Sequence, residues 1–423
     1  AWLSDYSNDL MVKSGGNLVR WMHVTPWKQD VESCDRVGLI EAMPAGDAEK
    51  DIAGRRWEQR VELMRDAIIY NRNNPSILFY ECGNKGISLD HFLEMKKIRD
   101  QYDPNGGRAI GSREMLAIPE AEYGGEMLYV NKSKAHPLWM MEYCRDEGLR
   151  KNWDNWSYPY HQEGDGPLYR GKPAPEYNHN MDEFAVQMVR AWYDYYLERP
   201  GTGKRVNAGG AKIVFSDTNT HFRGAVSYRT SGVTDAMRIP KDAFFAHQVM
   251  WDGWVNPEKD HTYIVGHWNY PKGTVKPVYV VSSADKVELR LNGTPVGKAR
   301  QDYRYLFTFD SIAYQPGRLE AIGYRAGKEV SRYALETAGE PDHIKLTTIQ
   351  NPEGFKADGA DLAMVQVEVV DKQGRRCPLD NRDIRFNMYG EGQWLGGIAV
   401  SKKHYDYSHD VQNVTTRTPS DRP

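Results

Sequence analysis

Residues 56–71 read Arg56-Trp-Glu-Gln-Arg-Val-Glu-Leu-Met-Arg-Asp-Ala-Ile-Ile-Tyr-Asn71, and after five intervening residues the chain continues as Ile77-Leu-Phe-Tyr-Glu81. In the first stretch apolar side chains recur three and four residues apart, which predicts a helix with one buried face. The second stretch is short and apolar and follows a proline, as expected of a strand that is buried on both faces. A helix followed by a buried strand is the repeating unit of parallel α/β sheets.

The same alternation extends outward over the first ~250 residues. Six more apolar runs predict strands, at 17–22, 38–43, 108–111, 127–130, 138–142 and 212–216, and helical patterns lie at 1–14, 90–101 and 181–197. Seven strands behind a leading helix predict a (β/α)8 TIM barrel whose first strand is missing from this sequence. A seven-stranded open sheet is the alternative.

The pattern changes after Trp254. Residues 261–337 alternate in short strands with turn signals, and the Asn-Gly pair at 292–293 predicts a hairpin between two strands. Residues 341–400 repeat this pattern, with a strand at 363–370 and a turn at 371–375. We therefore predict a barrel domain at 1–254, an immunoglobulin-like β-sandwich at 255–340 and a second immunoglobulin-like domain at 341–423, with a polar, pattern-free end.

Composition narrows the classes of function. The formal net charge of -3 gives no electrostatic reason to expect nucleic acid, and no apolar stretch is long enough to span a membrane. The chain has 26 Tyr and 12 Trp beside only 11 Phe. Aromatic rings with a polar group suit surfaces that are partly apolar and partly hydrated, such as sugar-binding clefts. Most of the Tyr and Trp residues fit an ordinary hydrophobic core equally well. The sequence contains no C-x-x-C pair and no metal-ligand spacing, so no metal or cofactor is predicted. The oligomeric state is left open.

In a parallel barrel, reactive side chains lie where strands end. The candidates at these ends are Arg20, His23, Glu81, Asn84, Lys85, Glu142, Arg145, Asp217, Asn219 and His221. Glu142 is the strongest candidate, because it follows the apolar run 137–141 directly. Burying a carboxylate costs free energy, so it is expected to have an ionic partner or a catalytic role. It is either a catalytic group or one half of a structural ion pair with Arg145 or Arg20.

Four spaced motifs then appear in order. They are Asn17-x-x-Arg20-x-x-His23, Cys34-Asp35-x-x-Gly38, Arg72-Asn-Asn-Pro-Ser-Ile77 and Gly83-Asn84. In this order they resemble glycoside hydrolase family 2, which contains β-galactosidases, β-glucuronidases and β-mannosidases. The resemblance covers about residues 10–400 and implies a retaining mechanism, with Glu142 at the position of the nucleophile and Asn84 at that of the residue that contacts the sugar 2-hydroxyl. It also implies terminal β-glycosidic bonds as the target, in the manner of a β-galactosidase, and a periplasmic or secreted location in a bacterium.

The sequence departs from the family at one position. The acid/base glutamate of the family directly follows that asparagine, whereas this chain has Lys85. With a free pKa near 10.4, a lysine is a poor acid at neutral pH and cannot act as a base. Three explanations stay open: another carboxylate, such as Glu81, Asp146 or Glu147, supplies the proton; Lys85 clamps an anionic sugar, a uronate or a sulfated one; or the site binds glycan without cleaving it.

Residues 153–180 are rich in aromatic side chains and follow the Glu142 strand, so Trp153 and His161 are predicted to contact substrate, as is Tyr123 near another strand end. The loop can equally pack on itself. The predicted function is that of a glycoside hydrolase that acts on oligo- or polysaccharides. Its substrates could include acidic or sulfated glycans. The alternatives are a glycan-binding homologue without activity and a uronate-directed lyase that uses Lys85 as its base.

Overall fold

The computed structural model describes residues 1–44, 50–126, 136–143, 147–148, 156, 178–197, 207–218, 230–380, 382–398, 405–406 and 415–417. The chain divides into two compact units. The first contains Ala1–Arg145 and Trp192–Ile213, and the second contains Asp146–Ala191 and Val214–Pro423.

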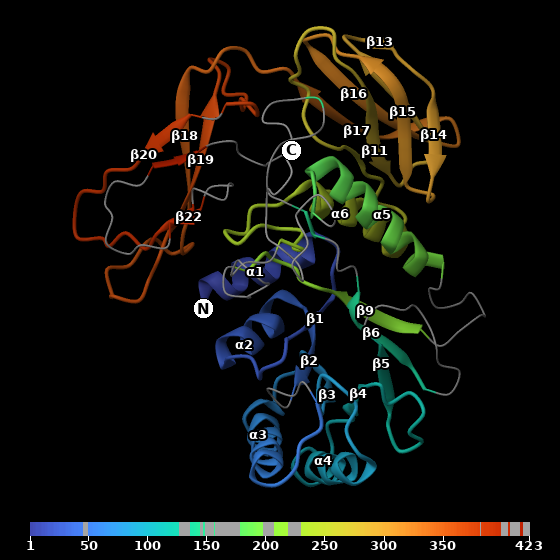
Figure 1. Ribbon diagram of the computed structural model, residues 1–423, viewed down its shortest axis with the longest axis vertical. Helices are drawn as coiled ribbons and strands as arrows, with labels where there is room; N and C mark the ends of the chain where they lie inside the picture. Colours follow the sequence, from blue (N-terminus) through green and yellow to red (C-terminus); the bar gives the residue numbers. More distant parts are fainter. Residues whose placement is uncertain are drawn as a thin grey trace. The chain divides into compact units, whose positions relative to one another are not determined.

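The first unit is built on one parallel sheet of seven strands (Figure 1). In sheet order they are β1 (Leu18–Arg20), β2 (Ile40–Pro44), β3 (Ile77–Glu81), β4 (Ala109–Arg113), β5 (Tyr123–Glu126), β6 (Leu138–Tyr143) and β9 (Asn207–Lys212). The edge strands β1 and β9 contact each other, so the sheet curves into a nearly closed barrel. This confirms the predicted parallel α/β barrel, here with seven strands.

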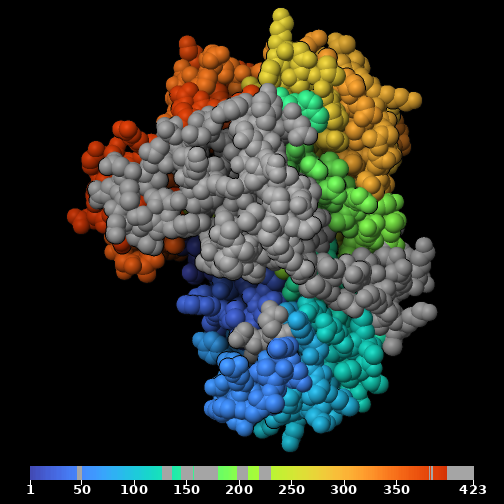
Figure 2. Space-filling model, viewed as in Figure 1, coloured from blue at the N-terminus to red at the C-terminus, as the bar shows by residue number. Residues whose placement is uncertain are grey.

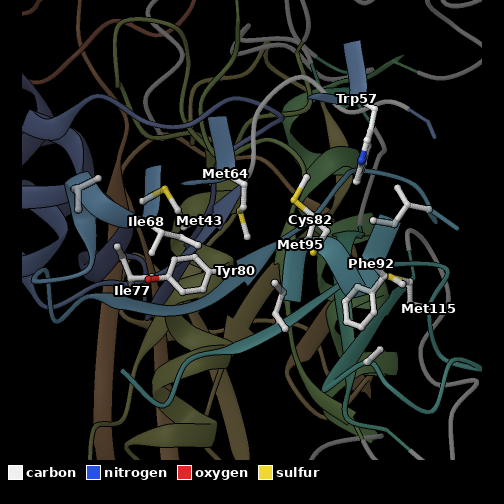
Figure 3. Packing of buried hydrophobic residues seen from close by; sticks show 14 residues of the cluster. Met43, Trp57, Met64, Ile68, Ile77, Tyr80, Cys82, Phe92, Met95 and Met115 are labelled. Atoms are coloured by element: carbon white, nitrogen blue, oxygen red, sulfur yellow. The ribbon is translucent and has the colours of Figure 1, made fainter. Parts of the chain in front are cut away.

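Helices cover the outer face of this sheet. They are α1 (Trp2–Lys13), α2 (Lys28–Val37), α3 (Arg55–Asn71) and α4 (Leu89–Tyr102), while α5 (Met181–Leu197) runs from the second unit into the first. Met64 of α3 and Phe92 of α4 pack with Tyr80 of β3 and with Cys82, which follows that strand, in one buried cluster (Figure 3). Burying these faces is the main source of stability for such helices. The opposite faces of α3 and α4 lie at the molecular surface (Figure 2).

A second cluster fills the interior of the barrel. Phe79 of β3, Tyr123 of β5, and Trp139 and Met141 of β6 pack together there. Phe79 lies two residues before Glu81, and side chains two apart on a strand point to the same face. The interior cluster therefore forms the floor beneath the end of β3.

The last strand of the sheet was misplaced by the sequence prediction, and the described part of β5 was not predicted as a strand. The last strand is β9, residues 207–212, and not 212–216; β5 covers 123–126, while the predicted 127–130 lies outside the described residues. Both contain Gly-Gly, which is usually read as a turn. Here the missing side chains make room: a Cβ on Gly125 would lie 2.1 Å from Met141 Sδ, and one on Gly210 would lie 2.7 Å from Met140 Cβ.

The second unit contains α6 (Asp242–Val255) and a sandwich of two antiparallel sheets. One sheet holds β10 (Thr262–Ile264), β11 (Val275–Ser282), β15 (Leu306–Ala313) and β14 (Ala299–Asp302), and the other β13 (Thr294–Pro295), β12 (Lys286–Leu291), β16 (Arg318–Arg325) and β17 (Lys328–Glu336). Both sheets contribute to one buried cluster around Trp268 and Phe307. The antiparallel β-sheets predicted after the barrel are confirmed.

The predicted hairpin turn joins β12 to β13, and both of its residues have positive φ, 51° at Asn292 and 83° at Gly293. That is the backbone of the tight turn for which Asn-Gly is favoured.

The remaining strands pair two by two. They are β18 (His343–Ile349) with β19 (Met364–Val370), β20 (Asp383–Arg385) with β23 (Thr415–Arg417), β21 (Gly397–Ile398) with β22 (Tyr405–Asp406), and β7 (Glu147–Gly148) with β8 (Asn178–His179). Among the described residues, no helix is both long enough and apolar enough to cross a bilayer.

Candidate active site

Three charged side chains from three separate strands meet at the carboxyl end of the barrel. Arg20 ends β1, Glu81 ends β3, and Glu142 is the last residue but one of β6. Arg20 Nε donates to Glu81 Oε2 at 2.7 Å, and Nη2 contacts the other oxygen of the same carboxylate. Arg20 Nη1 donates to Glu142 Oε1 at 3.1 Å. One guanidinium therefore binds both carboxylates.

The position of Glu142 depends on an irregularity in β6. Trp139 and Met141 point into the barrel, so strict alternation along the strand would send Glu142 to the helix side. Between Met140 and Tyr143, however, β6 advances three residues while β9 advances two, from Gly210 to Lys212. This extra residue is a β-bulge, a feature that re-aims side chains. It allows the side chains of Met141 and Glu142 to point to the same face of the sheet.

Burial makes this charge cluster energetically important. Glu81 is 1% exposed and Glu142 is 5% exposed. Burial by itself lowers the pKa of Arg20, but the charges of Glu81 and Glu142 outweigh that effect and hold its pKa above the ordinary value. Arg20 is therefore a fixed cation between two buried carboxylates.

Asn84 and His23 extend the cluster. Arg20 Nη2 donates to Asn84 Oδ1 at 3.1 Å, and His23 Nε2 lies 3.5 Å from Glu142 Oε1. The structure thus brings together five of the predicted site residues, namely Arg20, His23, Glu81, Asn84 and Glu142. The ion pair between Arg20 and Glu142 is also one of the two structural ion pairs that were expected from the sequence as the alternative to a catalytic role for Glu142.

Lys85 follows Asn84 but behaves differently. Its side chain is exposed and has no ion pair with any residue that the structure describes. The loop that holds it is fixed through its backbone, because Ser112 Oγ lies 2.6 Å from the carbonyl oxygen of Gly83 and 2.9 Å from that of Lys85, and its single hydroxyl proton is shared between them. Ser112 was missed in the sequence; a small hydroxyl residue inside an apolar strand was the available signal. The result is a lysine whose backbone is fixed and whose side chain is exposed.

Two other predicted contacts have protein partners. The Tyr123 hydroxyl donates to the carbonyl oxygen of Tyr80 at 2.9 Å, which places Tyr123 in the barrel interior. Asp217 belongs to the second unit, where Lys241 Nζ lies 2.9 Å from its carboxylate and the Gly232 amide donates to Oδ1. Burial raises the pKa of Asp217 to about 7, against the opposing effect of Lys241.

Arg145, Trp153, His161, Asn219 and His221 lie outside the described residues, as does Asp146. The backbone of Glu147 is described as the start of β7. Within the described part of the chain, no group of three or more His, Cys, Asp or Glu residues could hold a metal ion.

Two buried carboxyl groups beside each other are the groups that one kind of chemistry uses. A retaining glycosidase needs two carboxyl groups about 5–5.5 Å apart, one to attack the anomeric carbon and one to exchange a proton with the leaving oxygen. Glu142 and Glu81 contact neighbouring nitrogens of a single guanidinium, so the two carboxyl groups lie close together.

Comparison with known proteins points in the same direction. A family model described as glycoside hydrolase family 2 C-terminal domain 5 matches residues 344–416, and a domain of unknown function (DUF4982) matches residues 273–331. A β-glucuronidase of Formosa agariphila is 35% identical over 95% of this chain and 40% of its own length. A solved β-glucuronidase of glycoside hydrolase family 2 superposes with a TM-score of 0.84 at 34% identity, over 98% of this chain and 43% of that one.

A more limited match is to the β-galactosidase BoGH2A of Bacteroides ovatus, 32% identical over 40% of this chain and 19% of that protein. The chain thus spans less than half the length of these relatives.

Proposed function

Because this chain belongs to glycoside hydrolase family 2, we propose that the protein is a retaining β-glycosidase that removes terminal uronic acid residues from glycans. The observation that carries the proposal is the pair of buried carboxylates, Glu142 and Glu81, on the single guanidinium of Arg20. The prediction of a β-galactosidase-like activity receives less support, since the β-glucuronidase relative matches 95% of the chain and the β-galactosidase 40%. A periplasmic or secreted location stays a proposal.

In this proposal Glu142 attacks the anomeric carbon while the glycosidic C–O bond breaks. A protonated Glu81 gives its proton to the departing oxygen. Water then attacks the glycosyl ester, passes a proton to Glu81, and restores both carboxyl groups. Arg20 contacts both carboxyl groups and therefore holds them in position during both steps.

The acid/base role of Glu81 can be tested by removing its carboxyl group. Glu81→Ala is expected to slow hydrolysis of an alkyl β-glucuronide by about 10²–10⁴-fold, the usual contribution of general acid–base catalysis. Hydrolysis of a nitrophenyl β-glucuronide, whose leaving group needs no proton, should fall much less. Azide added to this variant should give a β-glycosyl azide, because it enters from the face that water uses. An equal loss with both leaving groups and no azide product would assign the role to another residue.

Lys85 is proposed to bind the carboxylate of the uronic acid. Its ammonium group is exposed, next to Asn84, and has no counter-ion among the described residues. A charge-assisted hydrogen bond contributes about 1.5–3 kcal/mol, so Lys85→Met should raise KM for a nitrophenyl β-glucuronide about 10- to 100-fold.

The matched control is the nitrophenyl β-glucoside, which differs from the glucuronide only in lacking the carboxylate. If the protein hydrolyses the glucoside, the KM for that substrate should change by less than about twofold in Lys85→Met, because the glucoside has no carboxylate for the ammonium group to bind. Equal losses on both substrates would show that Lys85 serves the reaction itself. An unsaturated product that absorbs in the ultraviolet, and that is lost in the variant, would favour the lyase alternative.

A further inference from the structure

A cavity of about 380 Å³ opens in the second unit between α6 and the strands β10 and β17. Its walls come from Phe245 and Gln248 of α6, from His261 and Tyr263 beside or in β10, and from Arg332 and Tyr333 of β17. The volume lies within the range of about 300–1,000 Å³ that is usual for small-molecule sites. None of these residues belongs to the carboxylate cluster of the barrel.

Three aromatic rings form the apolar part of the cavity wall. The rings of Phe245 and Tyr263 stack with their centroids 4.9 Å apart, and Tyr333 packs against Tyr263 at 4.9 Å with a tilt of 54°. The Tyr263 hydroxyl donates to the buried carboxylate of Asp242, which fixes this ring. Tyr263 is only 3% exposed and supports its neighbours, whereas Phe245 and Tyr333 are half-buried and offer apolar surface with little conformational entropy to lose on binding.

The charged groups of the cavity are already paired. Asp260 binds Arg325, His261 Nε2 lies 2.8 Å from Asp252, and Arg332 contacts Glu329 at 2.9 Å and Glu320 at 3.1 Å. An ionic ligand would therefore meet no unbalanced charge of opposite sign. A ligand with several hydroxyl groups can instead share these donors and acceptors, together with the amide of Gln248 and the hydroxyl of Ser331.

Apolar rings bordered by balanced polar groups are suited to a sugar, whose ring faces are apolar and whose rim carries hydroxyls. We propose that this cavity is an accessory binding site for a neutral sugar unit of a glycan. The ligand of this cavity would be neutral, whereas the ligand proposed for Lys85 is a negatively charged uronate. The proposal does not depend on catalysis, because it rests on the cavity and on its paired charges.

The test is binding of four neutral probes, cellohexaose, xylohexaose, mannohexaose and galactohexaose, to the protein by saturation-transfer NMR and calorimetry. At least one should bind, and Tyr333→Ala and Gln248→Ala should each weaken it about tenfold, the equivalent of 1.4 kcal/mol. Gln248→Ala alters a half-buried helix side chain and guards against a folding defect in Tyr333→Ala. Tyr389→Ala, at a tyrosine that is 91% exposed and does not line the cavity, is the matched control and should leave binding unchanged.

Two results would overturn the proposal. One is that none of the four probes binds. The other is that binding survives both cavity substitutions, or is lost in Lys85→Met instead, which would place it at the barrel site. The rate on a nitrophenyl β-glucuronide should be the same in Tyr333→Ala as in the parent protein, so that a failure of the proposed enzyme activity and a failure of the accessory site are separate outcomes.

Discussion

Replacing Glu142 by glutamine is expected to lower kcat on a nitrophenyl β-glucuronide by about 10⁴-fold or more, as removal of a nucleophile does in other enzymes. Glutamine has nearly the same shape, and its carbonyl oxygen can still accept from Arg20 Nη1, which now lies 3.1 Å from Glu142 Oε1. The loss should therefore appear in kcat with the fold retained. Steady-state kinetics with far-ultraviolet circular dichroism on the same samples measures both.

Two controls make this result specific. Glu58→Gln makes the same chemical change on the exposed face of α3, where the side chain is 63% exposed, and should leave kcat unchanged. Glu142→Gly with added azide should form an α-glycosyl azide, because azide then attacks from the face that the carboxylate occupied. A Glu142→Gln protein with more than a tenth of the parent kcat would exclude Glu142 as the nucleophile.

Replacing Arg20 by alanine is expected to be the most destabilising single change at the site. It leaves Glu81, 1% exposed, and Glu142 without their shared cation, and an uncompensated buried charge costs about 3–5 kcal/mol. The measurement is the free energy of unfolding in urea. The matched control is Arg36→Ala, because Arg36 pairs with Asp5 on the surface, where its side chain is 47% exposed. Such pairs contribute about 0–1 kcal/mol.

A second substitution tests the cause of that loss. If repulsion and desolvation of Glu81 dominate, the double variant Arg20→Ala/Glu81→Gln should be more stable than Arg20→Ala alone, since it removes one of the two unpaired charges. A loss below about 1 kcal/mol in Arg20→Ala would mean that water or other groups already neutralise the carboxylates, and the described charge cluster would not hold the site together.

Much of the barrel could be predicted because strands buried on both faces are recognisable as short apolar runs. This was true of β1, β2, β3, β4 and β6. It failed for β9 and did not identify residues 123–126 of β5, because the glycines of both strands suggest turns although they are needed where Met140 and Met141 pack against the backbone. A local pattern cannot reveal such a requirement, since the crowding atoms come from a neighbouring strand.

The residues that form the site could be predicted from the sequence, but the geometry of their contacts could not. Strand-end positions identified Arg20, Glu81, Asn84 and Glu142, because carboxyl ends of parallel strands meet at one edge of the sheet. The bulge that turns Glu142 toward Arg20 depends on the register between β6 and β9, and no feature of either strand alone encodes it. The double contact of Arg20 with Glu81 likewise depends on the barrel curvature that brings β1 and β3 together with β6.

The central claim is that the carboxylate of residue 142 becomes bonded to the sugar during turnover. The direct measurement is to incubate the protein with a 2-deoxy-2-fluoro-β-glucuronosyl fluoride, digest it and locate the added mass by peptide sequencing in the mass spectrometer. We expect one label, on Glu142. A label on Glu81 or Lys85, or no label on a protein that turns over an aryl β-glucuronide, would contradict it.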